Sequence, residues 1–322
     1  MENIINRYKG RKMPALFTVI CALVMEIVIF SIASPYFLTV KNFLKIGLYA
    51  AIVGVISCSV TFINISGNID LSVGSQIAAV GMVAAIFSRN MGFPWYGVVP
   101  VCLLTGMVMG AINGFFITVL KLNAFITTIA TMQIFRGFAY LVTAGMPIGI
   151  TDQKYIFLGR GYVYGIPISL IVLLITNIIF HLISKYTVFG RNIYLIGGNP
   201  MAAFLSGVKV NKLRFQLYLL NGFMCAVSGI LMSAQTGAGV PNTASTYNMT
   251  ALSAVILGGA ALTGGKGTIL GTFLGSMVLS ILSNGMTILS IGVYWQEIVI
   301  GMVLLLAVSI DAIKGGSLKR KI

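Results

Sequence analysis

Charged side chains are scarce in this sequence, and acidic ones are the scarcest of all. Only 8% of its 322 residues are charged, with six Asp or Glu, 21 Lys or Arg and one histidine, His181. A soluble domain carries about 25% charged residues, so this chain cannot cover a globular surface. The few acids and the histidine form no cluster typical of an acid–base pair or a metal site. We therefore expect a membrane chain that is not itself an enzyme.

Cysteine is also rare, and its spacing excludes two further classes of protein. Cys21, Cys58, Cys102 and Cys225 all lie in apolar stretches, and no two of them form a CxxC pair. A disulfide framework or a cysteine metal site is recognised by such spacings. We expect inert buried thiols and no bound cofactor.

Nucleotide and nucleic-acid binding lack their usual signals. The stretch 260–267 resembles a phosphate-binding loop, but that loop requires glycine at position 260 and serine or threonine at 267, where this chain has Ala260 and Gly267. The net charge of +15 is spread between apolar stretches and is not gathered in one patch. The chain is therefore predicted to bind neither ATP nor nucleic acid.

Long apolar stretches are what the sequence has in abundance. Hydrophobic residues make up 58% of the chain, and a membrane-spanning helix needs about 20 of them in a row. The candidate spans are 14–34, 46–66, 70–88, 95–120, 124–143, 164–184, 214–235, 249–263, 268–289 and 293–312. The span 249–263 is short, at roughly 22 Å, so it is either partial or lengthened by the polar residues before it. We predict an all-α polytopic membrane protein with about ten transmembrane helices in a single domain, 1–322.

Basic residues indicate the orientation of the chain. They gather near both ends and in the loop 185–214. Cytoplasmic segments collect Lys and Arg, so both termini and this loop are predicted to be cytoplasmic, which an even number of spans allows. The basic residues then placed outside are predicted to attract an acidic partner or lipid head groups; they are Lys41, Lys45, Arg89, Lys154 and Arg160.

Some charged residues fall within or beside the predicted spans. Ionisable residues inside a membrane are candidates for function, and here they are Glu26, Asp70, Arg136 and Glu297. Asp70 stands at the start of the third span, where Asp commonly caps a helix. We favour a cap over direct contact with a substrate. Glu26 and Glu297 can pair either with Arg136 or with neutral groups.

Neutral hydrogen-bonding groups are more frequent in the spans than charges. Asn123, Thr127 and Thr131 are four residues apart and share one helix face, which indicates either a path lining or contacts between helices. The uncharged run 236–248 carries hydroxyl and amide groups that suit a neutral polyol, although we favour an exterior loop. We predict a path with weak contacts from Asn68, Asp70, Gln76, Asn123, Thr127 and Asn242.

Three blocks of sequence carry a family resemblance. The segment 190–207, the glycine-rich segment 257–267 and the segment 68–74 resemble, in the same order along the chain, those of ribose-type (monosaccharide) ABC transporter permeases. These belong to the branched-chain amino acid/ribose permease superfamily, and the similarity covers nearly the whole chain. By this resemblance the loop 185–214 is the ATPase-coupling loop, and its coupling residues are Gly190, Arg191, Gly197, Gly198, Asn199, Pro200, Ala202, Ala203, Ser206 and Gly207. The residues themselves predict a short helix here, because Asn199 can cap it and Pro200 suits its first position.

The resemblance implies a type II ABC importer-like permease in the bacterial cell (inner) membrane. Its implied partners are a cytoplasmic ABC ATPase subunit, an extracellular or periplasmic sugar-binding protein, and a second permease copy, identical or paralogous. The implied substrate is a monosaccharide such as ribose, allose or xylose. Two alternatives stay open. One is a nucleoside or branched-chain amino acid ABC permease, and the other is an ion-coupled secondary transporter, which would use membrane acids such as Asp70 and Glu297.

Overall fold

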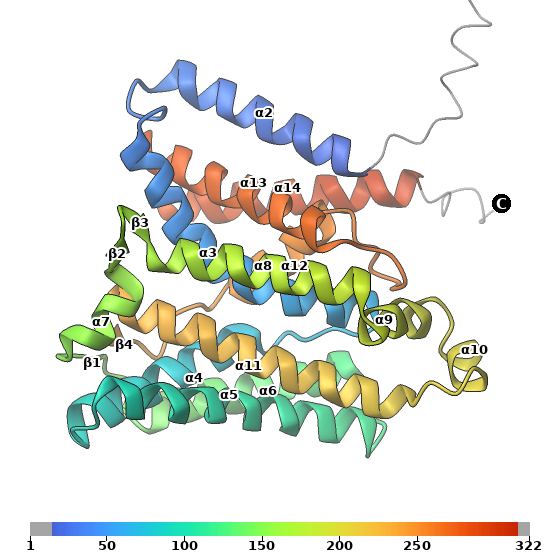
Figure 1. Cartoon of the computed structure of the whole chain (residues 1–322). Helices are drawn as coiled ribbons and strands as arrows, with labels where there is room; N and C mark the ends of the chain where they lie inside the picture. The colour runs from blue at the N-terminus through green and yellow to red at the C-terminus, as the bar shows by residue number, and fades with distance from the viewer. Residues whose placement is uncertain (1–14, 315–322) are drawn as a thin grey trace, which may run out of the picture.

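Each of the ten predicted spans corresponds to a helix in the computed structural model, which describes residues 15–314 (Figure 1). The helices are α2 (Ala15–Ala33), α3 (Val40–Ile65), α4 (Val73–Ala85), α5 (Trp95–Thr118), α6 (Ala124–Leu141), α8 (Ile168–Tyr186), α11 (Val210–Thr236), α12 (Tyr247–Leu257), α13 (Ile269–Ile288) and α14 (Val293–Lys314). By length and hydropathy, α2, α3, α5, α8, α11 and α13 can each cross a membrane. The all-α prediction is confirmed.

The remaining elements lie at the two ends of the bundle. At one end are α7 (Gln153–Arg160) and two short antiparallel pairs, β1 (Ile148–Gly149) with β4 (Ala238–Gly239) and β2 (Tyr162–Val163) with β3 (Ile166–Pro167). We call this the hairpin end. At the opposite end, the loop end, are α9 (Val188–Gly198) and α10 (Pro200–Leu205) (Figure 1). Helix α2 begins and α14 ends at the loop end, as an even number of crossings requires. The basic clusters predicted near the termini, apart from Lys314, lie outside the described residues.

The centre of the bundle is formed by α3, α4 and α11. Nearly all of α3 and every residue of α4 are buried, whereas α2 is mostly exposed. Helices α5 and α11 approach closely because glycines face each other: a Cβ added at Gly110 would lie 2.3 Å from the Tyr218 carbonyl oxygen, and one at Gly222 would lie 2.1 Å from that of Gly106. Small residues permit this close packing of membrane helices.

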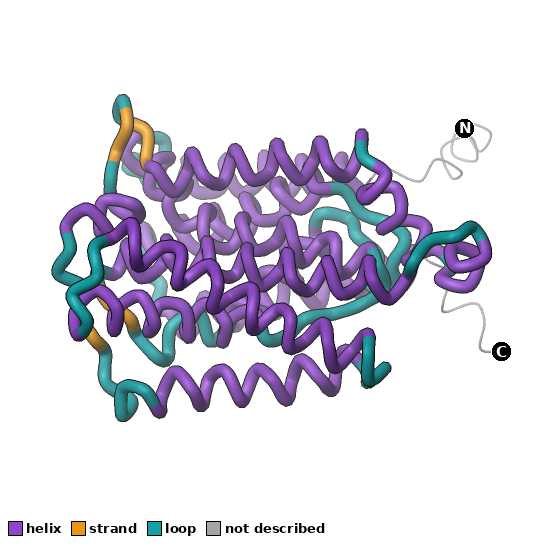
Figure 2. The backbone as a smooth tube through the Cα atoms, turned by 60° about the horizontal axis from the view of Figure 1, so that its bottom comes forward, coloured by secondary structure: helices purple, strands orange, loops and turns teal. Residues whose placement is uncertain are grey.

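Two helices of the bundle, α4 and α12, are short, and non-helical backbone completes these two spans inside the bundle. The third predicted span, 70–88, begins only at Val73, and α4 continues into the π-helical turn η1 (Ile86–Asn90). The eighth, 249–263, ends at Leu257, because glycines at 258 and 259 start a turn. The residues before α12 are not helical, so α12 stays at 11 residues, about 16 Å long. Figure 2 shows loops that reach between the helices from both ends.

Candidate functional site

The buried carboxylate of Asp70 lies at the centre of a polar network inside the bundle. Asp70 is in the linker 66–72 between α3 and α4 and is 4% exposed. Its Oδ1 accepts hydrogen bonds from the backbone N–H of Ser72 at 2.8 Å and from the Ser72 hydroxyl at 2.6 Å. Its Oδ2 accepts from Nδ2 of Asn221 at 2.9 Å and Nδ2 of Asn113 at 3.3 Å. Four donors match an ionised carboxylate, which can only accept.

Further hydrogen bonds tie this network to the neighbouring elements. The Ser59 hydroxyl of α3 donates to Asn221 Oδ1 at 2.7 Å, and the Tyr218 hydroxyl of α11 donates to the Ile69 carbonyl at 2.9 Å. The linker is therefore fixed to α3, α5 and α11. The helix α4 follows from Ser72, its N-cap residue, so Asp70 organises the turn before the helix and is not itself the N-cap. The prediction that Asp70 caps this helix is therefore wrong, because the N-cap is Ser72, two residues later, and its side chain forms no capping hydrogen bond.

The orientation of two amide side chains follows from the Ser72 hydroxyl. Because Ser72 gives its only hydroxyl hydrogen to Asp70, it must accept from Nε2 of Gln76 at 2.8 Å and from Nδ2 of Asn113 at 2.9 Å. The amide oxygens then point elsewhere, and Gln76 Oε1 and Asn113 Oδ1 are buried without a hydrogen-bond partner. Such groups usually bind water or a ligand, so they are free to accept from a hydroxyl.

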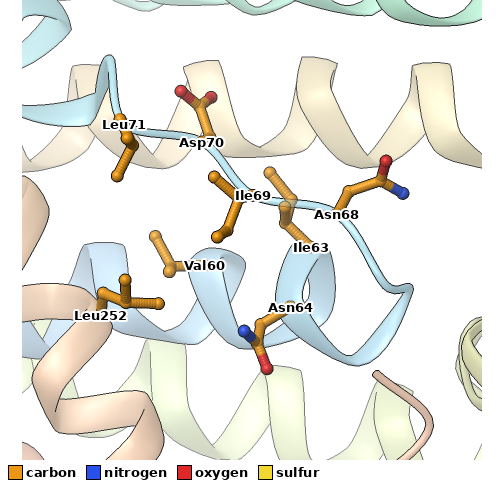
Figure 3. A pocket seen from close by; sticks show the side chains of 8 residues that line it. All are labelled: Val60, Ile63, Asn64, Asn68, Ile69, Asp70, Leu71 and Leu252. Carbon is orange, nitrogen blue, oxygen red and sulfur yellow. The ribbon is translucent and has the colours of Figure 1, made fainter. Parts of the chain in front are cut away.

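A narrow gap lies on the other side of the linker from the Asp70 carboxylate (Figure 3). Its lining residues are Val60, Ile63, Asn64, Asn68, Ile69, Asp70, Leu71 and Leu252. The gap has no room for a water molecule, and the side chain of Asn64 is buried beside it with neither amide atom hydrogen-bonded. This gap is therefore too small for a sugar.

The other predicted path residues do not gather at one place. Gln76 is linked to Asp70 through a hydrogen bond to Ser72. Asn123 lies at the start of α6, at the loop end. Asn242 accepts a hydrogen bond at 3.3 Å from the hydroxyl of Tyr140, which lies near the opposite end of α6. Asn68 donates to the Ser66 hydroxyl at 3.1 Å, and Thr127 is buried with its hydroxyl unpaired. Sequence reasoning missed three network members, Ser72, Asn113 and Asn221. Lone amides inside apolar spans were the available signal for the last two.

Asn123 has a capping role that the sequence did not reveal. Its Oδ1 accepts from the backbone N–H groups of Phe125 at 2.9 Å and Ile126 at 3.3 Å. We expect Asn123→Ala to destabilise the start of α6 by about 1 kcal/mol, the usual cost of losing an N-cap. Asn123→Asp keeps the cap and serves as the control. Thermal unfolding of the purified protein measures both, and equal midpoints for the two variants would contradict the capping role.

Arg136, the basic residue predicted within a span, has neutral partners. One guanidinium nitrogen, Nη1, donates to the carbonyl oxygens of Pro241 at 2.6 Å and Thr243 at 2.8 Å. The sequence left either Arg136 or neutral groups as partners for Glu26 and Glu297, and the hydrogen bonds of Arg136 go to these backbone carbonyl oxygens. The helix α6 thereby holds the irregular segment that precedes α12.

The predicted coupling loop contains two helices. Thr187 caps α9 by accepting from the Gly190 N–H at 3.0 Å, and a Cβ at Gly190 would lie 2.2 Å from the Ile183 carbonyl oxygen. The side-chain oxygen of Asn199 caps α10 by accepting hydrogen bonds from the backbone N–H groups of Met201 and Ala202, at 3.0 Å each. Pro200 is the first residue of α10. The short helix predicted from Asn199 and Pro200 is confirmed.

At the end of α9 the backbone of Gly197 lies directly against the backbone of Ile65 and Gly265. We call this contact the glycine junction. A Cβ at Gly197 would lie 1.7 Å from the Ile65 carbonyl oxygen and 2.6 Å from the Gly265 nitrogen. The same Gly265 N–H donates to the Ile65 carbonyl at 2.7 Å, and the Tyr194 hydroxyl donates to the Gly267 carbonyl at 3.0 Å. The predicted coupling loop thus touches both the last residue of α3, where the Asp70 linker begins, and the turn after α12.

The helix α10 projects from the loop end with an apolar surface. Met201, Phe204 and Leu205 are 66%, 64% and 77% exposed. A groove of about 720 Å³ lies between α10 and the start of α11, lined by Asn199, Pro200, Met201, Phe204, Lys209, Val210, Asn211 and Lys212. A solvated surface of this kind, rimmed by polar residues, is typical of a protein interface.

Comparison with known proteins places these features among transport proteins. Residues 42–308 match the family described as branched-chain amino acid transport system / permease component. A ribose import permease protein from Haemophilus influenzae is 36% identical over 90% of this chain and 91% of its own length. An L-arabinose transport system permease protein from Escherichia coli is 38% identical over 87% of this chain and 85% of its own, and a ribose import permease protein from Bacillus subtilis is 37% identical over 88% and 89%. No solved structure matches the chain significantly.

Proposed function

This chain belongs to the branched-chain amino acid transport system / permease component family, and we propose that it is the membrane-spanning subunit of an ATP-driven importer for a monosaccharide. Membership makes it a multi-pass, non-catalytic ABC transporter permease. The choice of a monosaccharide rests on one observation: relatives named for ribose and for L-arabinose match along nearly the whole chain. The unpaired amide oxygens of Gln76 and Asn113 support it, because sugar hydroxyls donate hydrogen bonds.

We further propose how the chain meets its partners. The groove beside α10 receives a separate ATPase subunit, so the loop end and both termini are cytoplasmic. Two lysines at its rim, Lys209 and Lys212, suit an acidic surface on that subunit. The hairpin end then faces outside and receives the sugar-binding protein. A second permease copy completes the path between them.

The proposed path uses weak contacts from neutral groups. The sugar in transit forms hydrogen bonds with neutral side chains, those of Asn68, Gln76, Thr127 and Asn242. Asp70 and Asn123 instead stabilise the backbone that borders the path. A tight site would retain the substrate, because transport requires release as well as entry. The contacts of Asp70 with four protein donors leave it little capacity for the ion coupling that a secondary transporter needs.

Uptake by proteoliposomes tests this function. The permease is reconstituted with the ATPase and binding protein of its transporter, and uptake of labelled ribose, arabinose, uridine and leucine is compared. We expect ATP-dependent uptake of a pentose. Uptake of only uridine or leucine would contradict the sugar assignment, and uptake driven by a proton or sodium gradient without ATP would contradict the importer.

A variant of α10 tests the docking surface in the same vesicles. We expect Phe204→Glu to reduce uptake at least tenfold and to prevent co-purification of the ATPase, because it places a charge in the apolar groove without disturbing the bundle. The matched control is Tyr164→Asp, a fully exposed aromatic at the hairpin end, opposite to the groove, which should leave co-purification of the ATPase unchanged. Normal ATPase binding by Phe204→Glu would show that docking occurs elsewhere.

A further inference from the structure

The segment 237–246, between α11 and α12, does not remain at the hairpin end. A Cβ added at Gly239 would lie 2.5 Å from the Gly81 carbonyl oxygen, and one at Gly74 would lie 2.2 Å from the Ala244 carbonyl oxygen. Gly81 and Gly74 are seven residues apart on α4, which is about 10 Å along its axis. The segment therefore runs inward beside α4 until it reaches the first turn of that helix.

The innermost residue of the segment, Ala244, lies near the middle of the bundle. It packs in an apolar cluster with Val73, Ile77 and Cys225, and Cys225 is close to the centre of α11 (Val210–Thr236). Ala244 has φ of 55°, a left-handed conformation that is unusual for a residue with a Cβ. Backbone of this kind persists where the surroundings impose it, often at segments that switch.

Two short helices start from this contact in opposite directions. The helix α4 runs to η1 at the hairpin end, and α12 runs to the turn 258–268 at the glycine junction of the loop end. At this depth the Ala244 carbonyl of the segment lies directly against Gly74 of α4. Irregular backbone inside a membrane is tolerated where it is buried in protein or lines an aqueous cavity.

The opposite side of the segment is polar and exposed. Asn242, Ser245 and Thr246 are exposed, whereas their neighbour Ala244 is buried. Hydroxyl groups at the depth of Ala244 would be costly against lipid, so this side faces water or a path. The two sides of the segment thus differ: one packs on α4 and the other is suited to a hydrated sugar.

The helix α6 holds the segment with two side chains one turn apart. Arg136 donates from Nη1 to the carbonyl oxygens of Pro241 and Thr243, and the Tyr140 hydroxyl donates to Asn242 Oδ1 at 3.3 Å. Arg136 is half-buried. A charged side chain within a span is costly, and these bonds to backbone carbonyls offset part of that cost. Neutral acceptors bind a guanidinium less strongly than a carboxylate does, which makes the contact reversible.

From these contacts we propose that the segment 237–246 is the outer seal of the transport path and that Arg136 is its latch. The inference rests on the proposed function and adds the element that opens. In the closed arrangement Ala244 lies on Gly74. Opening requires Arg136 to release both carbonyls, after which the segment moves away from α4 and admits substrate from the hairpin end.

A reversible cross-link tests the seal. In a Cys21→Ser background, Tyr140→Cys and Asn242→Cys are joined by a short bifunctional thiosulfonate; the remaining native thiols are buried. We expect ATP-dependent sugar uptake to fall at least tenfold and to recover after reduction. The control is the single variant Tyr140→Cys in the same background. Its one accessible thiol has no second thiol to join, so the reagent should not change its uptake.

The outcomes separate the seal from the function on which it rests. Unchanged uptake after complete cross-linking of positions 140 and 242 would overturn the seal and leave the sugar importer standing. Absence of sugar uptake by the unmodified protein, with its partners present, would overturn the function and the seal together.

A labelling measurement tests the latch without relying on transport. Ala244 is 6% exposed, so a thiol introduced by Ala244→Cys should react slowly with a small membrane-impermeant reagent. Combining it with Arg136→Gln should raise the labelling rate severalfold, whereas Arg136→Lys, which keeps a cationic donor, should raise it less. Equal labelling in all three backgrounds would show that Arg136 is not the latch.

Discussion

Replacing Asp70 with alanine is expected to destabilise the protein by roughly 3 kcal/mol or more and to abolish transport. The substitution leaves the Ser72 N–H and the amides of Asn113 and Asn221 without their acceptor. Each buried donor left unpaired costs about 1–3 kcal/mol, far more than the roughly 0.6 kcal/mol of an ordinary hydrogen bond between membrane helices. Thermal unfolding in detergent and sugar uptake in proteoliposomes measure the two effects.

Two further variants separate this structural role from contact with substrate. Asp70→Asn keeps the shape and one acceptor oxygen but turns an amide donor toward other donors, so we expect a smaller loss of stability. Asn68→Ala, two residues away, removes only local bonds to Ser66 and should unfold at nearly the same temperature as the unmodified protein. An Asp70→Ala protein that unfolds normally yet does not transport would instead assign the carboxylate to the substrate.

The positions of the membrane helices were predictable because each is encoded locally. An apolar stretch of about 20 residues has few stable alternatives in a bilayer. The helix α10 was predictable for the same reason, since Asn199 and Pro200 are adjacent to the helix that they start. In these cases the sequence neighbours of a residue are also its physical partners.

The broken helices were harder to predict because their partners are distant in sequence. The span 70–88 contains enough apolar residues for a helix, yet its first three residues precede the helix, and Asp70 there binds Asn113 and Asn221. Likewise, the run 236–248 reads as an exterior loop, and its descent beside α4 depends on Gly74 and Arg136. Composition alone does not show such pairings.

Glycine explains a second part of what the sequence left open. The segments 190–207 and 257–267 were each recognisable by resemblance, but nothing in either indicates that Gly197 meets Gly265 or that both meet Ile65. A glycine permits two backbones to approach closely, but its presence in the sequence does not indicate which segment it contacts. The junction between coupling loop and linker therefore appears only in three dimensions.

Replacing Gly197 with alanine is expected to disconnect the coupling loop from the bundle. The new Cβ would lie 1.7 Å from the Ile65 carbonyl oxygen, inside the space of the hydrogen bond that this oxygen accepts from Gly265. The backbone must shift, because no flexible side chain can yield, and overpacking of this kind costs about 1–3 kcal/mol. The shift occurs where α9 meets the start of the Asp70 linker. We therefore expect uptake to fall at least tenfold while the ATPase still binds α10.

The neighbouring residue provides a matched control for this prediction. The resemblance places Gly198 among the coupling residues, but a Cβ there would have nothing within 4 Å. Gly198→Ala should therefore leave uptake and thermal stability unchanged. The ratio of sugar transported to ATP hydrolysed in proteoliposomes is the decisive measurement. We propose that the junction transmits motion from the ATPase to the linker. Gly197→Ala should then hydrolyse ATP without transporting sugar, whereas Gly198→Ala should keep the two coupled. If both variants transport sugar with the same yield per ATP, motion reaches the linker by a route other than the glycine junction.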